Sequence, residues 1–396
     1  MLLSLMLAAT SPQAQAQHIT TIGEEMTVET GGAWTRLSPY SKGWHLFFAA
    51  GGDYARLPMS HDFVVEDVDR QRLTGMSHLD DHAIALCPDG KFFHIASGGT
   101  TTDNDSSYAF TYDDNLEIVE SGAIIESASN LRFNDMPLLC NDLGQFTAFL
   151  DYGNAWPVFM ELSRSGEIIN EVTLGQLPIA EGSSLIQHPD GESIIFISSA
   201  RDTRGLNLSI LDTDFSLIDN LEISRMEPET RAHWPQGAII IHDRLFVSYI
   251  RQKDSDDWSD DWGDLWLAIF DLEWNLLEDF VVVDTVAPDG AMRPSLTQSD
   301  RTLVVSYDRL EGGNFGDVSP RLVVMELDES LFPTQEDTGD TGDSGLDSDT
   351  SGCGCNSTGN RSMAISWLIA IALALLGRRN LSGQEPLASD IVNETG

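Results

Sequence analysis

The feature that most constrains the fold is a pattern of four short β-like runs that recurs along the chain. Residues 183–224 show it clearly as SSLIQ, SIIFISSA, LNLSILD and SLIDNLEIS, which are rich in β-branched and bulky apolar residues. The turn signals Pro189-Asp190-Gly191 and Asp212-Thr213-Asp214 join the first two and the last two runs. The segment therefore predicts a four-stranded antiparallel sheet.

Related runs occur both before and after this segment. They lie at residues 82–97 with 107–121, 137–152 with 157–174, 237–251 with 265–283, and 294–309 with 321–332. Residues 43–68 form a divergent first copy, whose innermost run is expected around Trp34 to Leu37. Four-strand units repeating about every 50 residues are typical of β-propeller blades. Six copies predict an all-β, six-bladed propeller over residues 17–334, with a seven-bladed ring or a pair of β-sandwiches as alternatives.

The two ends of this body indicate how the ring closes. The last copy stops after its third strand near Phe332, and residues 18–29 form a strand that has no blade of its own. We expect this strand to complete blade six, because an open ring would leave two apolar blade faces in water.

The charge of the chain excludes one class of partner. Its 63 acidic and 22 basic residues give a net charge of −41, which repels phosphate backbones and makes nucleic-acid binding untenable. The ordinary interpretation is a solvated acidic surface. Such a surface also attracts divalent cations.

The loops that enter the innermost strands are the expected place for a functional site. The repeat alignment places polar residues there: His78, Asp81, Asn134, Asp135, Glu181, His233 and Arg293. Asp135, Glu181 and His233 are the candidate metal ligands, a set that could hold Ca²⁺ or another divalent ion. In its position at the channel mouth, and without a shared sequence motif, this set loosely resembles the metal centres of six-bladed lactonase-type hydrolases. A polar ring around a water-filled channel is the alternative, and no catalytic residue is predicted.

Motifs of known propeller families are absent, so the body is assigned to none of them. The chain has no sialidase Asp box, no recurring WD40 pairs, no G-x-S-x-G elbow and no H-E-x-x-H. An acidic insert at residues 253–264 holds Trp258 and Trp262, which could anchor a protein or glycan partner. The alternative is a flexible loop whose tryptophans fold back onto the blade.

Cys87 and Cys140 occupy equivalent positions in the inner strands of neighbouring blades. Equivalent positions in adjacent blades are expected to lie farther apart than the 7 Å or so that a disulfide allows between Cα atoms. We therefore predict two buried or free thiols, with a disulfide between them as the alternative.

Both ends of the chain indicate export. Residues 1–16 are apolar and end in Ala14-Gln15-Ala16, a small-x-small pattern that predicts signal-peptide cleavage after Ala16. Residues 335–361 lack hydrophobic periodicity, and we expect a disordered acidic linker that carries Cys353 and Cys355. Residues 362–379 form a short apolar helix ending in an arginine pair, and residues 380–396 form a polar tail. The apolar helix is short for a ~30 Å hydrocarbon core but suits a stop-transfer element.

The tail resembles the C-terminal surface-sorting signal called MYXO-CTERM in the order of its elements: a linker, Gly-Cys-Gly-Cys, an apolar helix and the pair Arg378-Arg379. The resemblance covers about the last fifth of the chain, and the chain departs from the pattern by continuing to Gly396. It implies recognition by a membrane sorting protease, processing or lipid attachment at Cys353 or Cys355, and display at the cell surface.

The sequence as a whole favours an exported, envelope-anchored propeller that acts as a binding or adhesion module. The alternative is a metal-dependent hydrolase or lyase with its site at the channel mouth. A coat protein without a specific ligand is the third possibility.

Overall fold

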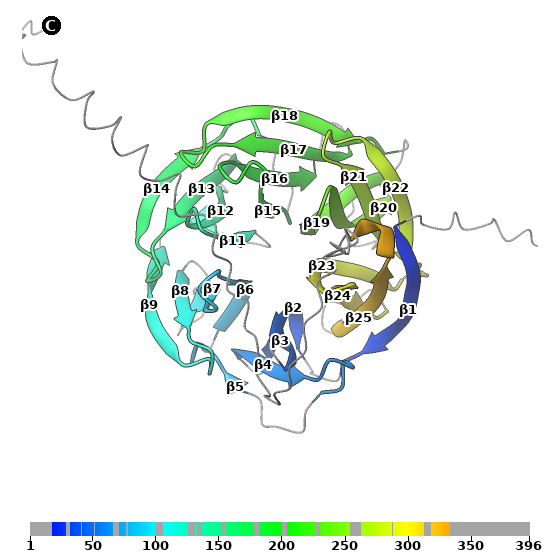
Figure 1. Cartoon of the computed structure of the whole chain (residues 1–396). Coiled ribbons are helices and arrows are strands. Elements are labelled where there is room, and N and C mark those ends of the chain that lie inside the picture. Colours follow the sequence, from blue (N-terminus) through cyan, green and yellow to red (C-terminus); the bar gives the residue numbers. More distant parts are fainter. Residues whose placement is uncertain are drawn as a thin grey trace, which may run out of the picture. The chain divides into compact units, whose positions relative to one another are not determined.

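The computed structural model describes residues 18–28, 32–40, 42–50, 52–65, 71–76, 78–99, 106–125, 131–132, 137–151, 156–177, 182–199, 204–226, 230–253, 263–286, 288–312 and 318–332. The chain divides into two compact units, Met1–Gln335 and Glu336–Gly396, and every described residue lies in the first. This unit consists of six antiparallel sheets arranged around a central axis (Figure 1). The predicted six-bladed β-propeller is confirmed.

Each blade runs from an inner strand at the axis to an outer strand at the rim (Figure 1). Blade 1 contains β2 (Ala33–Tyr40), β3 (Gly43–Ala50), β4 (Asp53–Met59) and β5 (Gln71–Arg72). Blade 2 contains β6 (His78–Leu86), β7 (Phe92–Gly99), β8 (Ser107–Tyr112) and β9 (Ile118–Ile125). Blade 3 contains a divided inner strand, β10 (Leu131–Arg132) and β11 (Leu138–Cys140), followed by β12 (Gln145–Asp151), β13 (Trp156–Leu162) and β14 (Ile168–Thr173).

The remaining blades follow the same order. Blade 4 contains β15 (Ser184–Gln187), β16 (Ile194–Ser199), β17 (Leu206–Leu211) and β18 (Leu217–Ser224). Blade 5 contains β19 (Thr230–Ile241), β20 (Arg244–Lys253), β21 (Asp264–Asp271) and β22 (Leu276–Val283). Blade 6 contains β23 (Gly290–Ser299), β24 (Thr302–Leu310), β25 (Val318–Leu327) and β1 (Ile19–Thr27). A 3-10 turn, η1 (Glu329–Leu331), follows β25 and is the one helical element among the described residues.

The N-terminal strand closes the ring, as the sequence predicts. β1 pairs antiparallel with β25, from Ile19 opposite Leu327 to Thr27 opposite Arg321, and forms the outer strand of blade 6. The first strand of the chain therefore completes the last sheet, and blade 1 lies next to blade 6 (Figure 1).

Side chains fix this closure as well as the backbone ladder. Glu25 of β1 accepts a hydrogen bond from the Tyr307 hydroxyl at 2.5 Å and pairs with Arg309 at 2.8 Å. At the start of β1, Nδ1 of His18 lies 2.5 Å from Oε1 of Glu278 on the outer strand of blade 5. The N-terminal strand thus contacts two blades.

Burial along each blade explains the sequence pattern. All six residues of β16 are buried, whereas β14 at the rim alternates between exposed and half-buried residues. A middle strand is covered by a blade on each face and so reads as a continuous apolar run. Rings from neighbouring blades interlock between the sheets, as between Phe159 of blade 3 and Phe196 of blade 4, whose centroids lie 4.9 Å apart.

The predicted turns also form. Gly191 closes the Pro-Asp-Gly turn of blade 4 with a φ of 76°, a left-handed conformation that glycine adopts without strain. In the turn after β17, Oδ1 of Asp212 accepts hydrogen bonds from the backbone N–H groups of Asp214 and Ser216 at 3.0 and 2.7 Å. This turn directs Phe215 into the core, where its side chain is fully buried.

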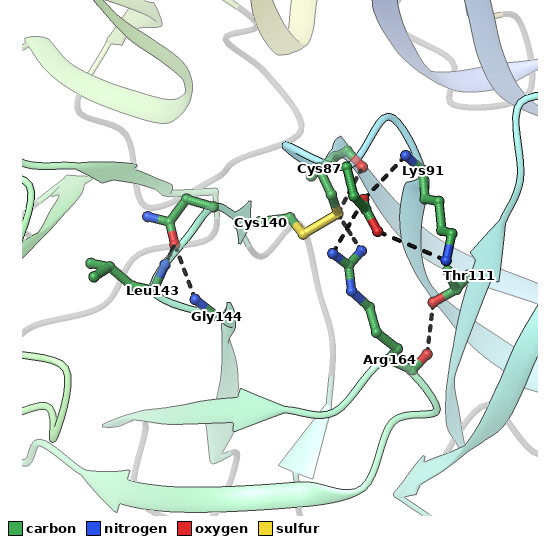
Figure 2. The surroundings of a disulfide bond; sticks show 10 residues. Cys87, Lys91, Thr111, Cys140, Leu143, Gly144 and Arg164 are labelled. Atoms are coloured by element: carbon green, nitrogen blue, oxygen red, sulfur yellow. Dashed lines mark hydrogen bonds and ion pairs between the residues drawn. A yellow bond between two sulfur atoms is a disulfide. The ribbon is translucent and has the colours of Figure 1, made fainter. Parts of the chain in front are cut away.

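The prediction of two separate thiols is wrong, because Cys87 and Cys140 form a disulfide (Figure 2). Cys87 directly follows β6 and Cys140 ends β11, and their Cα atoms lie 5.0 Å apart. Inner strands of adjacent blades converge at the axis, so equivalent positions there come much closer than positions farther out. Nη1 of Arg164, from the β13–β14 turn, lies 2.6 Å from Sγ of Cys87 (Figure 2).

Candidate functional site at the channel mouth

Three neighbouring inner strands share a strained bulge near their beginnings. The strands β2, β19 and β23 each place two or three residues opposite a single partner residue. The first residue in each bulge has a left-handed backbone: φ is 55° at Trp34, 45° at Trp234 and 49° at Arg293. Large side chains rarely adopt this conformation, and it is concentrated at functional sites.

The bulges bring these three side chains together across blades 5, 6 and 1. The guanidinium of Arg293 lies 4.7 Å from the ring centroid of Trp34 and 5.9 Å from that of Trp234. The ring of His233 lies 4.2 Å from that of Trp234. A cation between two indole rings is stabilised by their quadrupoles, so the arrangement holds Arg293 in place. We call Trp34, Trp234 and Arg293 the mouth cluster.

A buried carboxylate, that of Asp308, contacts two members of the mouth cluster, Trp34 and Arg293. Asp308 of β24 has no exposed surface, and it accepts hydrogen bonds from the backbone N–H of Trp34 at 2.7 Å and from the Thr35 hydroxyl at 2.9 Å. Nη1 of Arg293 lies 3.8 Å from the same carboxylate. Burial raises the pKa of Asp308, while Arg293, the hydrogen bonds from Thr35 and Trp34, and Arg36 act in the opposite direction.

A second arginine, Arg36, lines the channel cavity. Arg36 is only 8% exposed. Its Nη1 donates to the backbone carbonyls of Thr35 at 3.0 Å and Arg293 at 3.3 Å, and its Nη2 lies 3.5 Å from Oε1 of Gln236. All of these acceptors are neutral, and no carboxylate among the described residues forms an ion pair with Arg36.

The channel contains a cavity of about 150 Å³ to which all six blades contribute. Its polar side includes Arg36, Gln236, Ser184 and Ser295. Its aliphatic lining comes from the inner strands of several blades: Ala83, Ile84, Leu138, Leu185, Ala238 and Leu296. The cavity is small beside the 300–1,000 Å³ or so of drug-sized ligand pockets, so it suits a small ligand or the end of a longer one.

A chain of buried hydrogen bonds leads from the mouth into blade 2. Nε2 of His82 lies 2.5 Å from the Trp34 carbonyl, Nδ1 of His82 lies 3.2 Å from Nε2 of His94, and Nδ1 of His94 lies 3.0 Å from the Tyr112 hydroxyl. Burial lowers the pKa of His94 to about 3 and also lowers that of His82, which lies near His94 and Arg36. Both imidazoles are therefore neutral at pH 7.

Most of the residues singled out in the sequence lie outside the described residues. These are Asp135, Glu181, Trp258, Trp262, Cys353 and Cys355. His233 directly precedes the bulge of β19. Because Asp135 and Glu181 lie outside the described residues, the metal set stays a prediction. Within the described part of the chain, no group of three or more His, Cys, Asp or Glu residues could hold a metal ion.

Of the other residues expected at the mouth, Asn134 lies outside the described residues and His78 is the first residue of β6. The side chains of Arg293 and Asp81 are described. Arg293 belongs to the mouth cluster, whereas Asp81 is 1% exposed and its carboxylate accepts the backbone N–H of His82 at 2.6 Å. Sequence reasoning missed Trp34, Trp234 and Arg36 as site residues. The only available signal was their position at the start of predicted inner strands.

The fold and the site together define a six-bladed β-propeller with an arginine- and tryptophan-lined channel mouth. No family model matches the chain, and no curated protein matches it. Among solved structures, a protein of unknown function from Dyadobacter fermentans matches with a TM-score of 0.57 and 12% identity, over 77% of this chain and 98% of that one. A subtype N10 neuraminidase-like protein of A/little yellow-shouldered bat/Guatemala matches with a TM-score of 0.48 and 11% identity, over 78% of this chain and 98% of that one. At these identities the similarity concerns the fold alone.

Proposed function

We propose that the protein is an exported, envelope-anchored β-propeller that binds a ligand or partner at its channel mouth. The observation that carries the binding role is the mouth cluster, in which Arg293 lies over Trp34 and Trp234. Tryptophan and arginine are the residues most enriched among energetic anchors of binding surfaces. The three strained backbones and the contacts of Asp308 with Trp34 and Arg293 favour a preorganised site. Trp234 is 2% exposed and packs in the core, so Trp34 and Arg293 are the members proposed to contact a ligand.

The Cys87–Cys140 disulfide supports the proposed export. Structural disulfides persist in oxidising compartments and are rare in the cytosol. Both cysteines are largely buried, with exposed fractions of 3% and 7%, which is typical of a structural bond. The proposal places the propeller outside the cytoplasmic membrane.

The proposed anchoring rests on the tail sequence. Cys353, Cys355, the apolar stretch at residues 362–379 and its arginine pair lie outside the described residues. Among the described residues, no helix has the length and hydropathy needed to cross a membrane. We propose that a sorting protease recognises the tail and that Cys353 or Cys355 marks the site of processing or lipid attachment.

Two further expectations stay predictions. The acidic insert at residues 253–264, with Trp258 and Trp262, is proposed as a second contact surface for a protein or glycan. A Ca²⁺ ion held by Asp135, Glu181 and His233 would make the mouth a metal site and favour the hydrolase or lyase alternative.

The binding role is tested by screening the purified full-length protein against arrays of surface glycans and peptides. We expect a ligand whose binding falls at least tenfold in Trp34→Ala. Trp156→Ala is the matched control, because Trp156 is an exposed tryptophan at the start of β13, in blade 3, outside the mouth cluster. Ligands that bind both variants as tightly as the wild type would contradict a mouth site.

A further inference from the structure

The channel contains a buried arginine, Arg36, that forms no ion pair with any carboxylate of the described residues. Arg36 is more than nine-tenths buried, it lines the central cavity, and it donates only to two backbone carbonyls and an amide oxygen. Charged side chains are almost never buried without an opposite charge, because desolvation costs several kcal/mol per ion. Neutral acceptors replace part of the lost hydration but do not neutralise the charge.

The neighbouring carboxylate is already engaged elsewhere. Asp308 accepts from Trp34 and Thr35 and lies 3.8 Å from Arg293, so it serves the mouth cluster. It is not within ion-pair distance of Arg36. Asp308 interacts electrostatically with Arg36, but no described carboxylate forms a direct ion pair with this guanidinium.

We propose that the cavity beside Arg36 binds a small monocarboxylate. One guanidinium balances one negative charge, and a guanidinium fork matches a carboxylate well. Ser184, Ser295 and Gln236 supply further polar groups on the same lining, while Ala238, Leu296 and other aliphatic residues suit a short alkyl end. This inference rests on the proposed binding role of the channel and specifies its ligand chemistry.

The charge and size of the site select among anions. A multiply charged anion such as phosphate would meet a protein of net charge −41 with Arg36 as the one charged residue on the described cavity lining to offset it. A cavity of about 150 Å³ accommodates acetate or propionate more readily than a large organic acid. Chloride has the right charge but cannot use the fork geometry or the aliphatic lining.

The test is thermal unfolding of the full-length protein at pH 7 in sodium acetate, propionate, phosphate or chloride at matched ionic strength. We expect Tm to rise saturably with acetate and propionate and to rise less with chloride and phosphate. An equal or larger rise with chloride or phosphate would overturn the carboxylate assignment. Isothermal titration with acetate should give one site per chain.

Variants locate the site. Arg36→Met should lose the acetate-dependent rise, weakening acetate binding at least tenfold, and in low salt it should unfold at or above the wild-type Tm because a buried charge without a direct ion pair is gone. Arg56→Met is the control, since Arg56 lies on β4 of the same blade and is not among the residues that line the cavity. An acetate response that survives in Arg36→Met would overturn the proposal.

A second variant covers the case in which Arg36→Met does not fold. Ala238→Leu leaves Arg36 in place but fills the cavity, and it should abolish the acetate response as well. A full response in Ala238→Leu would contradict binding in this cavity. If the array screen finds a Trp34-dependent ligand but acetate has no effect on Tm, the monocarboxylate site is overturned and the binding function stands. If acetate raises Tm but the screen finds no such ligand, the monocarboxylate site stands and the proposed binding function is overturned.

Discussion

His94 donates its Nε2–H to Nδ1 of His82 across 3.2 Å in the interior of blade 2. The direction follows from the two ends of the chain. The Trp34 carbonyl can only accept, so His82 must carry its proton on Nε2, and Nδ1 of His82 must accept. Nδ1 of His94 then accepts from the Tyr112 hydroxyl at 3.0 Å. Each imidazole is therefore held as one neutral tautomer. The series from Tyr112 through His94 and His82 to the backbone carbonyl of Trp34, which we call the relay, would be broken by protonation of either imidazole.

This relay predicts that acid destabilises the protein. The pKa of His94 is lowered to about 3, so the unfolded chain takes up the proton first as the pH falls below about 6.5. The stability that depends on neutral His94 is complete above pH 6.5 and is lost progressively toward pH 3. Between pH 6.5 and pH 5 we expect a loss of about 2 kcal/mol from His94, with a further loss from His82. Urea denaturation at several pH values measures it.

A histidine variant separates this effect from general acid sensitivity. His94→Asn should be less stable at pH 7.5 and should show a flatter loss of stability toward pH 5 than the wild type. His61→Asn, which changes an exposed histidine, should keep the wild-type slope. Equal slopes in all three proteins would rule out the neutral relay.

The disulfide predicts a large stability difference between oxidised and reduced protein. Cys87 and Cys140 are 53 residues apart, and chain entropy gives about 4 kcal/mol for a loop of that length. Replacing both cysteines by alanine should therefore lower the free energy of unfolding by about 2–4 kcal/mol. Mass spectrometry of non-reduced peptides should find 87 linked to 140. Free thiols at both positions in exported protein would contradict the bond.

The contacts of Asp308 predict that its substitution lowers both the stability of the protein and ligand binding at the mouth cluster. In Asp308→Asn the side chain loses the charge that faces Arg293, and its NH2 group can no longer accept either the Trp34 bond made at Oδ2 or the Thr35 bonds made at Oδ1. We expect a loss of about 1–3 kcal/mol, measured by urea denaturation, together with weaker binding of any Trp34-dependent ligand. Asp243→Asn, at an exposed turn, should change stability by less than about 0.5 kcal/mol. Wild-type stability in Asp308→Asn would show that the carboxylate does not support the mouth cluster.

The parts of the fold that repeat could be predicted, and the parts set by local geometry could not. The Pro-Asp-Gly turn near Gly191 and the continuous apolar run of β16 identify a blade wherever they recur, and the leftover strand at 18–29 implied closure. The disulfide was missed because the convergence of inner strands at the axis is a property of the ring and is absent from any one repeat.

The mouth cluster was only partly foreseeable. Arg293 was expected at the mouth because the repeat alignment gave its position in the inner strand. Trp34 and Trp234 were not identified, because a left-handed backbone at a tryptophan has no sequence signal comparable to glycine in a turn. Arg36 looked like an ordinary strand residue, and its importance comes from its burial beside the cavity with no ion pair among the described residues, which only the assembled channel reveals.

Closure by β1 underlies every residue placed at the mouth, since it fixes blade 6 beside blade 1 and so Arg293 beside Trp34. The most direct measurement is the unfolding free energy of a variant that lacks residues 18–29. Ile19 and Val28 are each only 4% exposed, and losing their burial and the Glu25 contacts should cost at least about 3 kcal/mol. A synthetic peptide of residues 18–29 added in trans should restore part of the loss. Wild-type stability in the shortened protein would contradict the closed ring and the channel mouth built on it.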